Sequence, residues 1–444
     1  MVTRPGAESR KASLLQLAFM IYGAACAGAF GMEDMVSDAG PGAALVTLMV
    51  LPFIFSMPVA FAVAELSAAF PVEGGNYRWS LMAFGDFWGF QAGWWAWMSG
   101  VVVNSMFAVL FADYLQRWLP GMGPAGHWLA CLALIWFMCW LNVKGVRVVG
   151  NASIILSLVL LAPFVVLIAL GFAHWGRNPF SPFTAPPKGI LAGFGSAAAL
   201  GIWLYSGFDK LSTAAEEVDD PRRSFPLALF FAAALTMLSY VLPPLAALAA
   251  DGGWQAWSGA YFPAIAAVIG GPWLGSAMLF GALCSNALLL NVTMLSASRV
   301  MQTMAEDRFL PGVLAHLTPE RGMPGVALVL GSVVYSLFSF FDFTQLAVIY
   351  AWFQMGSYIL LYVNVWALRR TQPDVPRSFV VPFGKPGLFL SLGLTCSLAL
   401  LAIASAVFKG GRFAPAQAAI GVAALLSGPA AYRASKRWMR RAEA

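Results

Sequence analysis

Most of the 20 acidic residues lie between apolar segments or at their ends, but Asp209 lies inside one, two residues after Gly207. If that segment crosses a membrane, an unpaired carboxylate there costs about 2.5–3.5 kcal/mol. Such a group can serve as the counter-ion of a bound ammonium, as a carrier of protons, or as both in turn. The alternatives are a pair with Lys210 or a side chain that reaches the membrane surface, but adjacent residues on a helix do not face each other. We therefore predict a functional role for Asp209.

Two more carboxylates, those of Glu33 and Asp34, follow Gly31 near the end of the first apolar segment. Either side chain could bind an amine, and both could equally be solvated at an entrance to the protein. Of the two we take Glu33 as the candidate ligand.

Glycines interrupt two apolar segments at corresponding places. Residues 22–31 read YGAACAGAFG, and residues 201–209 read GIWLYSGFD. Where a helix stops and restarts, the freed N–H groups can bind a carboxylate and the freed carbonyl groups can bind an ammonium. We predict such N–H groups near Gly28 and such carbonyl groups near Gly207. The alternative is that the glycines only let membrane helices pack closely.

Aromatic side chains gather around both interruptions. Phe30 lies beside the first, and Trp203 and Tyr205 flank the second. An aromatic face can hold a desolvated ammonium with up to about 2 kcal/mol. The chain is 14% aromatic, so some clustering is expected without any function. We keep Phe30, Trp203 and Tyr205 as candidates because of their position at the breaks.

These candidate residues belong to a chain that is 60% hydrophobic and 10% charged, with a mean hydropathy of +0.75. Soluble domains are nearly half apolar and about a quarter charged, so a water-soluble fold is excluded. We predict an all-α integral membrane protein in the lipid bilayer, because a helix of about 20 apolar residues crosses the hydrocarbon and satisfies its own backbone hydrogen bonds. The twelve expected spans lie near 14–36, 43–69, 86–116, 127–143, 150–173, 190–213, 224–250, 273–303, 324–342, 345–368, 387–407 and 414–432.

The basic residues predict the orientation of these spans. With a cytoplasmic amino terminus, 21 of the 26 lysines and arginines fall on the cytoplasmic side and 5 on the other, as expected for the inner loops of membrane proteins. Both termini are therefore predicted to be cytoplasmic, in a cell membrane. The net charge of +6 does not indicate a nucleic-acid partner, because the basic residues stand beside apolar segments. We divide the chain into a tail (1–13), a ten-helix core (14–370), two additional helices (371–432) and a basic cytoplasmic tail (433–444).

Gly28 and Gly207 lie five predicted spans apart. An odd number of spans between equivalent elements means that the second copy is inverted in the membrane. This spacing predicts a five-helix inverted repeat with discontinuous helices 1 and 6, in which the solute binds near the middle of the membrane.

Three further motifs occur in order along the chain. Residues 64–77 read AELSAAFPVEGGNY, residues 215–226 read AEEVDDPRRSFP, and residues 304–311 read MAEDRFLP. The sequence resembles the amino acid, polyamine and organocation (APC) transporter superfamily in these motifs. That resemblance implies a leucine-transporter-like fold and a gating role for the acidic residues of the loop motifs.

Within the superfamily, residues 30–36 (FGMEDMV), 87–91 (FWGFQ) and 98–101 (MSGV), with Asn104, are most similar to the polyamine:proton symporter branch, which includes the plant polyamine uptake transporters. That branch has acidic residues where this chain has Val103, Leu290 and Val292, so an amino acid substrate stays open beside a polyamine. The candidate substrate-binding residues are Ala27, Gly28, Ala29, Phe30, Glu33, Asn104, Trp203, Tyr205, Ser206, Gly207 and Asp209, with Asp209 also assigned to proton coupling.

We therefore expect a secondary transporter of a small cationic or zwitterionic amine, polyamines first and amino acids second, with protons as the coupling ion. The alternatives are an amino acid permease or exchanger without polyamine activity, a channel, or an intramembrane enzyme. His127, His174 and His316 stand far apart between apolar segments, and no metal-binding motif is present, so we expect neither catalysis nor a cofactor. The sequence leaves symport or exchange, direction and homo-oligomerisation open.

Overall fold

The computed structural model describes residues 11–26, 28–186, 190–257, 261–319, 321–341, 343–409, 412–413 and 415–443. Ala27, one of the candidate site residues, lies outside the described residues.

The first half of the chain forms helices whose ends follow local sequence signals. Ser13 caps the first helix: its side chain accepts a hydrogen bond from the Gln16 N–H, and the Gln16 side chain reciprocates. Proline begins several of the others, where its missing N–H costs nothing. The elements are α1 (Leu14–Ala25), α2 (Glu33–Ala39), α3 (Pro41–Leu51), the π-helix η2 (Pro52–Ser56), α4 (Met57–Ala69), α5 (Asn76–Phe84), α6 (Asp86–Trp118), α7 (Pro124–Val143), α8 (Val146–Ala173), α9 (Ile190–Leu204) and the 3-10 helix η3 (Lys210–Glu217).

The described residues of the second half are also helical, apart from two short strands, β1 (Phe408–Lys409) and β2 (Arg412–Phe413), which pair antiparallel. Its last helix continues through residues 433–443, so the predicted basic tail is helical in the structure. The elements are α10 (Pro221–Ala250), η4 (Trp254–Ala256), α11 (Phe262–Gly270), α12 (Pro272–Glu306), η5 (Gly312–Ala315), α13 (Gly325–Phe338), α14 (Phe343–Thr371), α15 (Gly384–Val407), β1 (Phe408–Lys409), β2 (Arg412–Phe413) and α16 (Pro415–Glu443).

The distribution of side chains is that of a protein surrounded by lipid. Among the described residues, six helices are long and apolar enough to cross a membrane: α3–α4 taken together, α6, α7, α8, α10 and α12. Large apolar side chains such as Phe137, Ile155 and Phe280 are exposed on the outside of the bundle, while polar ones such as Gln354 and Asn364 are buried inside it. This inversion of the soluble pattern agrees with the predicted membrane fold.

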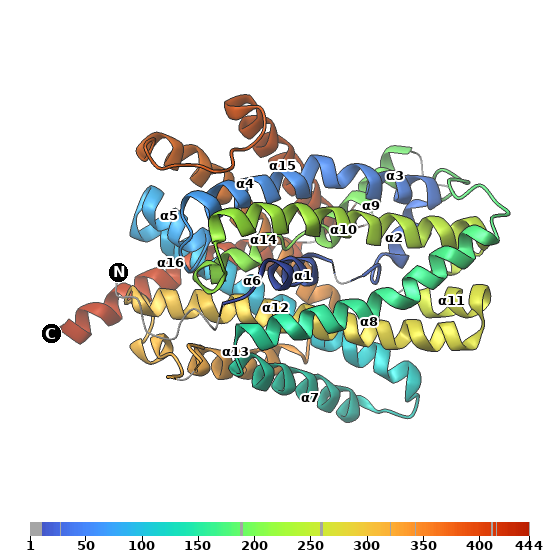
Figure 1. The fold of residues 1–444 in the computed structure, drawn as a ribbon, viewed down its shortest axis with the longest axis horizontal. Coiled ribbons are helices and arrows are strands. Elements are labelled where there is room, and N and C mark those ends of the chain that lie inside the picture. Colours follow the sequence, from blue (N-terminus) through green and yellow to red (C-terminus); the bar gives the residue numbers. More distant parts are fainter. Residues whose placement is uncertain are drawn as a thin grey trace.

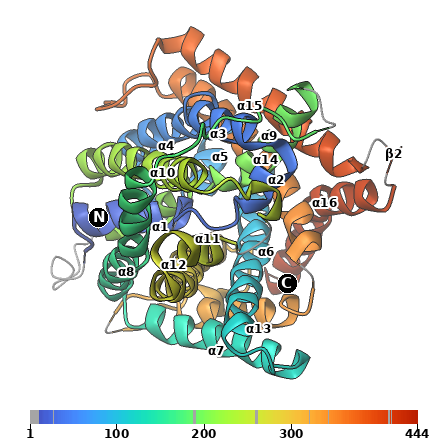
Figure 2. The same ribbon diagram turned by 90° about the vertical axis from the view of Figure 1, so that its right-hand side faces the viewer.

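The helices form one elongated bundle with the interrupted helices near its centre. Figure 1 shows α5 at one end of the bundle and α2 and α11 toward the other. In the view along the bundle, α1 and α2 lie inside a ring that includes α3, α6, α8, α10 and α12 (Figure 2). This central position gives the first interrupted helix contact with several surrounding spans.

Both predicted helix interruptions are present. α1 ends at Ala25 and α2 begins at Glu33, and between them Gly28 has φ +97°. α9 ends at Leu204 and η3 begins at Lys210, with Gly207 at φ +111° between them. Positive φ is the conformation that glycine adopts without strain, which explains why the chain breaks at these two residues.

Candidate functional site

A cavity of about 380 Å³ lies where the two interrupted helices meet. That volume is in the range of small-molecule binding sites. The breaks contribute Ala24, Ala25, Cys26, Phe30, Gly31, Leu204, Ser206 and Lys210 to its wall. The remaining wall comes from α2, α6, α9, α10, α12 and α14, including Val103, Tyr114, Tyr240, Asn286, Thr293 and Tyr350. The exposed residues Asp34, Asp113, Gln116 and Arg117 form its open end.

Three of the predicted site residues line this cavity. Phe30 is buried against Phe164, with ring centroids 4.9 Å apart, and Trp203 packs over Gly31. The hydroxyl group of Ser206 donates to the Ile202 carbonyl at 2.6 Å. The cavity therefore has an aromatic wall at each helix break.

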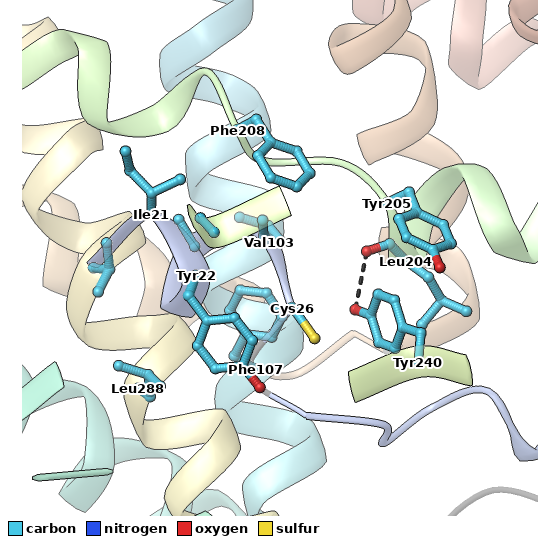
Figure 3. Packing of buried hydrophobic residues seen from close by; sticks show 14 of the residues in the cluster. Ile21, Tyr22, Cys26, Val103, Phe107, Leu204, Tyr205, Phe208, Tyr240 and Leu288 are labelled. Carbon is cyan, nitrogen blue, oxygen red and sulfur yellow. Dashed lines mark hydrogen bonds between the residues drawn. The ribbon is translucent and has the colours of Figure 1, made fainter. Parts of the chain in front are cut away.

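Tyr205, by contrast, directs its hydroxyl group away from the cavity. That group donates to the Leu48 carbonyl on α3 at 2.7 Å, and the ring packs edge-on against Tyr240 at 5.0 Å. Figure 3 shows the Tyr240 hydroxyl bonded to the carbonyl of Leu204, the last residue of α9, at 2.9 Å. Tyr240 thus satisfies one of the carbonyl groups that a helix end leaves without a partner.

Glu33 is fully buried and binds the backbone. One oxygen of its carboxylate accepts from the Gly31 N–H at 2.8 Å, and the other accepts from the Phe262 N–H at 3.4 Å. A carboxylate in the first turn of α2 also compensates the positive end of that helix. In this conformation Glu33 holds the first break together with α11 and does not line the cavity.

The other predicted residues of the first break and of α6 lie behind the wall. Gly28 approaches Leu160 and Phe164 of α8, and Ala29 is fully buried. Asn104 accepts a hydrogen bond through its Oδ1 from the hydroxyl group of Thr293, which does line the cavity. Asn104 therefore contacts the cavity wall through Thr293.

Gly207 is held between two other elements. Its N–H donates to the Tyr358 hydroxyl group at 2.8 Å. A Cβ atom at this position would lie 2.3 Å from the carbonyl oxygen of Ala24. The second break therefore packs directly on the end of α1, and only glycine fits there.

Asp209 and Lys210 are joined through a side chain of α14. The Asp209 carboxylate accepts from the Tyr358 hydroxyl group at 3.1 Å and from the Gln354 amide at 3.5 Å. The amide oxygen of Gln354 in turn accepts from the Lys210 ammonium at 2.9 Å, and that ammonium also donates to Ser99 at 3.2 Å. Asp209 lies outside the cavity wall, whereas Lys210 is part of it.

Lys210 is the main residue of the cavity wall that was not among the predicted site residues. The rule that adjacent helical residues do not face each other does not apply to Asp209 and Lys210, because helix α9 ends at Leu204. Ser285 and Asn286 of α12 were missed as well. Polar residues inside an apolar span were the signal that could have identified them. Among the described residues, no group of acidic, histidine or cysteine side chains could hold a metal ion.

A buried ion-pair cluster lies at the end of the bundle opposite the cavity mouth. Glu65 of α4 is 1% exposed and binds Arg369 of α14 through both oxygens, at 2.7 and 2.6 Å. The same carboxylate accepts from the Val381 N–H at 2.8 Å and lies 3.6 Å from Arg377. We call these four residues the Glu65 clamp.

A second set of polar contacts lies at the same end of the bundle, near the start of α6. Asp307, which follows α12, accepts hydrogen bonds from Tyr77 and from Arg78 of α5, the latter at 2.9 Å. Glu73 accepts from Gln302 of α12 at 3.2 Å. Two of the three loop motifs found in the sequence therefore contact each other, through Tyr77 and Asp307.

We expect Glu65→Gln to destabilise the protein strongly. Removing one charge from a buried pair leaves the arginines uncompensated, which costs about 3–5 kcal/mol of unfolding free energy. Asp86→Asn is the matched control, because Asp86 and Lys436 form an exposed pair that contributes about 0–1 kcal/mol. Denaturation of both variants in one detergent measures the difference. Equal stabilities of the two variants would contradict a stabilising role of the buried ion pairs of Glu65.

Comparisons of the sequence with known proteins show the family of this chain. The sequence model described as amino acid permease matches residues 13–425. This chain belongs to that family. Polyamine transporter RMV1 of Arabidopsis thaliana is 32% identical to this chain over 387 residues, which cover 86% of this chain and 78% of that protein. Polyamine transporter PUT1 of Oryza sativa subsp. japonica is 32% identical over 444 residues, which cover 98% and 81%. Branched-chain amino acid permease BcaP of Bacillus subtilis (strain 168) is 26% identical over 370 residues, which cover 78% and 77%.

Membership of the family confirms the resemblance drawn from the loop motifs and the all-helical membrane fold. This chain is a multi-pass membrane protein, and its named relatives are transporters and permeases rather than enzymes. The assignment of individual site residues stays a prediction.

Proposed function

We propose that the protein is a secondary active transporter that moves a small amine-bearing solute, a polyamine or an amino acid, across a cell membrane by alternating access. The observation that carries the proposal is the cavity at the junction of the two helix breaks, with the exposed residues Asp34, Asp113 and Arg117 at its open end. Relatives named as polyamine transporters and as a branched-chain amino acid permease support an amine as the substrate.

We further propose proton coupling through Asp209. The hydrogen bonds of Asp209 to Tyr358 and Gln354 link it to Lys210 at the cavity wall. A carboxylate in this place can gain or release a proton and so change the charge beside a bound solute. The cytoplasmic position of both termini is proposed on the distribution of lysine and arginine alone.

Reconstituted protein tests this function. We expect at least one amine from a panel of amino acids and polyamines to enter proteoliposomes faster than it enters protein-free liposomes. An inward proton gradient should increase the initial rate, and an uncoupler should abolish that increase. Uptake of an anionic sugar phosphate or nucleotide with no response to any amine would contradict the proposal.

A further inference from the structure

The charged residues of the cavity wall differ in depth. Asp34, Asp113 and Arg117 are exposed at the open end. Lys210, at the second helix break, is 6% exposed and is the one buried charged residue in the part of the wall that the structure describes. A solute that passes the open end therefore meets a positive charge at the bottom of the cavity.

The surroundings of Lys210 leave part of its ammonium for a ligand. Its two acceptors, the Ser99 hydroxyl group and the Gln354 amide oxygen, are both neutral and fully buried. The ring centroid of Tyr350, also in the wall, is 6.0 Å away. A lysine ammonium has three N–H donors, and two of them have acceptors among the described residues. The third is the donor that a bound solute can use.

The balance of charge around the cavity bottom disfavours a polycation. The Asp209 carboxylate offsets the positive charge of Lys210, and the Gln354 amide is hydrogen-bonded to both side chains. Glu33, the other buried carboxylate near the breaks, is engaged by two backbone N–H groups. A dication in this low-dielectric space would need further negative charge. A zwitterion brings its own carboxylate, and its amine can lie against the aromatic faces of Phe30 or Trp203.

We propose that Lys210 selects the substrate by charge: its ammonium binds a carboxylate of the transported solute and opposes a polyamine in the same position. The substrate class is then a zwitterionic amino acid. This inference rests on the proposed function, because it assumes that the cavity takes an amine-bearing solute.

Matched ligands test the selection without changing the protein. Ornithine and putrescine share the same carbon chain and two amines, and differ by one carboxylate; leucine and isopentylamine form a second such pair. For each pair we expect the amino acid to bind the purified protein at least about tenfold more tightly than its decarboxylated partner, the equivalent of one charge-assisted contact of about 1.4 kcal/mol.

Two substitutions then assign the difference to Lys210. Lys210→Met keeps the length of the side chain and removes its charge, so the preference for the amino acid should fall at least about tenfold. Lys210→Arg keeps the charge and should retain most of the preference. Lys385→Met, at an exposed position at the start of α15, is the control for loss of a lysine and should bind as the unchanged protein does. Because the readout is a ratio of affinities, partial loss of folded protein does not alter it.

The possible outcomes distinguish failure of this inference from failure of the proposed transport function. Putrescine binding as tightly as ornithine, with the same ratio in Lys210→Met, would overturn charge selection and leave an amine transporter. Absence of binding by every amine and amino acid would overturn both.

Discussion

Asp209→Asn should lower transport at least about tenfold, the effect of about 1.4 kcal/mol lost in one step. The carboxamide keeps the size of the side chain but neither carries the charge nor exchanges a proton. Lys210 then loses the negative charge that Gln354 connects to it. The pH dependence of uptake between pH 5 and 8 should flatten, while insertion into the membrane is retained. Initial rates in proteoliposomes measure both effects.

Asp374→Asn is the matched control for this prediction. Asp374 is exposed in the segment between α14 and α15, far along the chain from both helix breaks, so its substitution should leave the rate and its pH dependence unchanged. Near-normal, still pH-dependent transport by Asp209→Asn would exclude Asp209 both as a charge partner and as the proton carrier.

Gly207→Ala should nearly abolish transport and lower stability. The new Cβ atom would lie 2.3 Å from the Ala24 carbonyl oxygen, so backbone must move, and the φ of +111° is strained for any other residue. Strain of this kind costs about 1–3 kcal/mol before the clash is added. Both breaks should separate, which alters the cavity that they enclose. Uptake and thermal denaturation measure the two consequences.

Gly121→Ala controls for the loss of a glycine. Gly121 lies between α6 and α7, and a Cβ atom there would have no heavy atom within 4 Å. Its stability and transport should be unchanged. If Gly207→Ala were as stable and as active as Gly121→Ala, the close contact between the second break and α1 would have no role in the working protein.

Local properties of the sequence were sufficient for the class and outline of the fold. Whether a segment enters the bilayer depends on its summed hydrophobicity, and whether the chain can take positive φ depends on the residue itself. The apolar helices and the interruptions at Gly28 and Gly207 could therefore be predicted without knowledge of any contact. The loop motifs likewise gave the family, which the comparisons confirm.

Which side chains face the cavity was decided by the tertiary structure alone. The direction of Asp209 and Lys210 depends on where α9 ends and how the following turn packs on α1 and α14, and no local pattern encodes those contacts. Glu33 could have bound a solute, but the N–H of Phe262, more than 200 residues away, takes one of its oxygens. Sequence fixes which polar groups must be satisfied inside the membrane, whereas only packing determines whether the protein or a solute satisfies them.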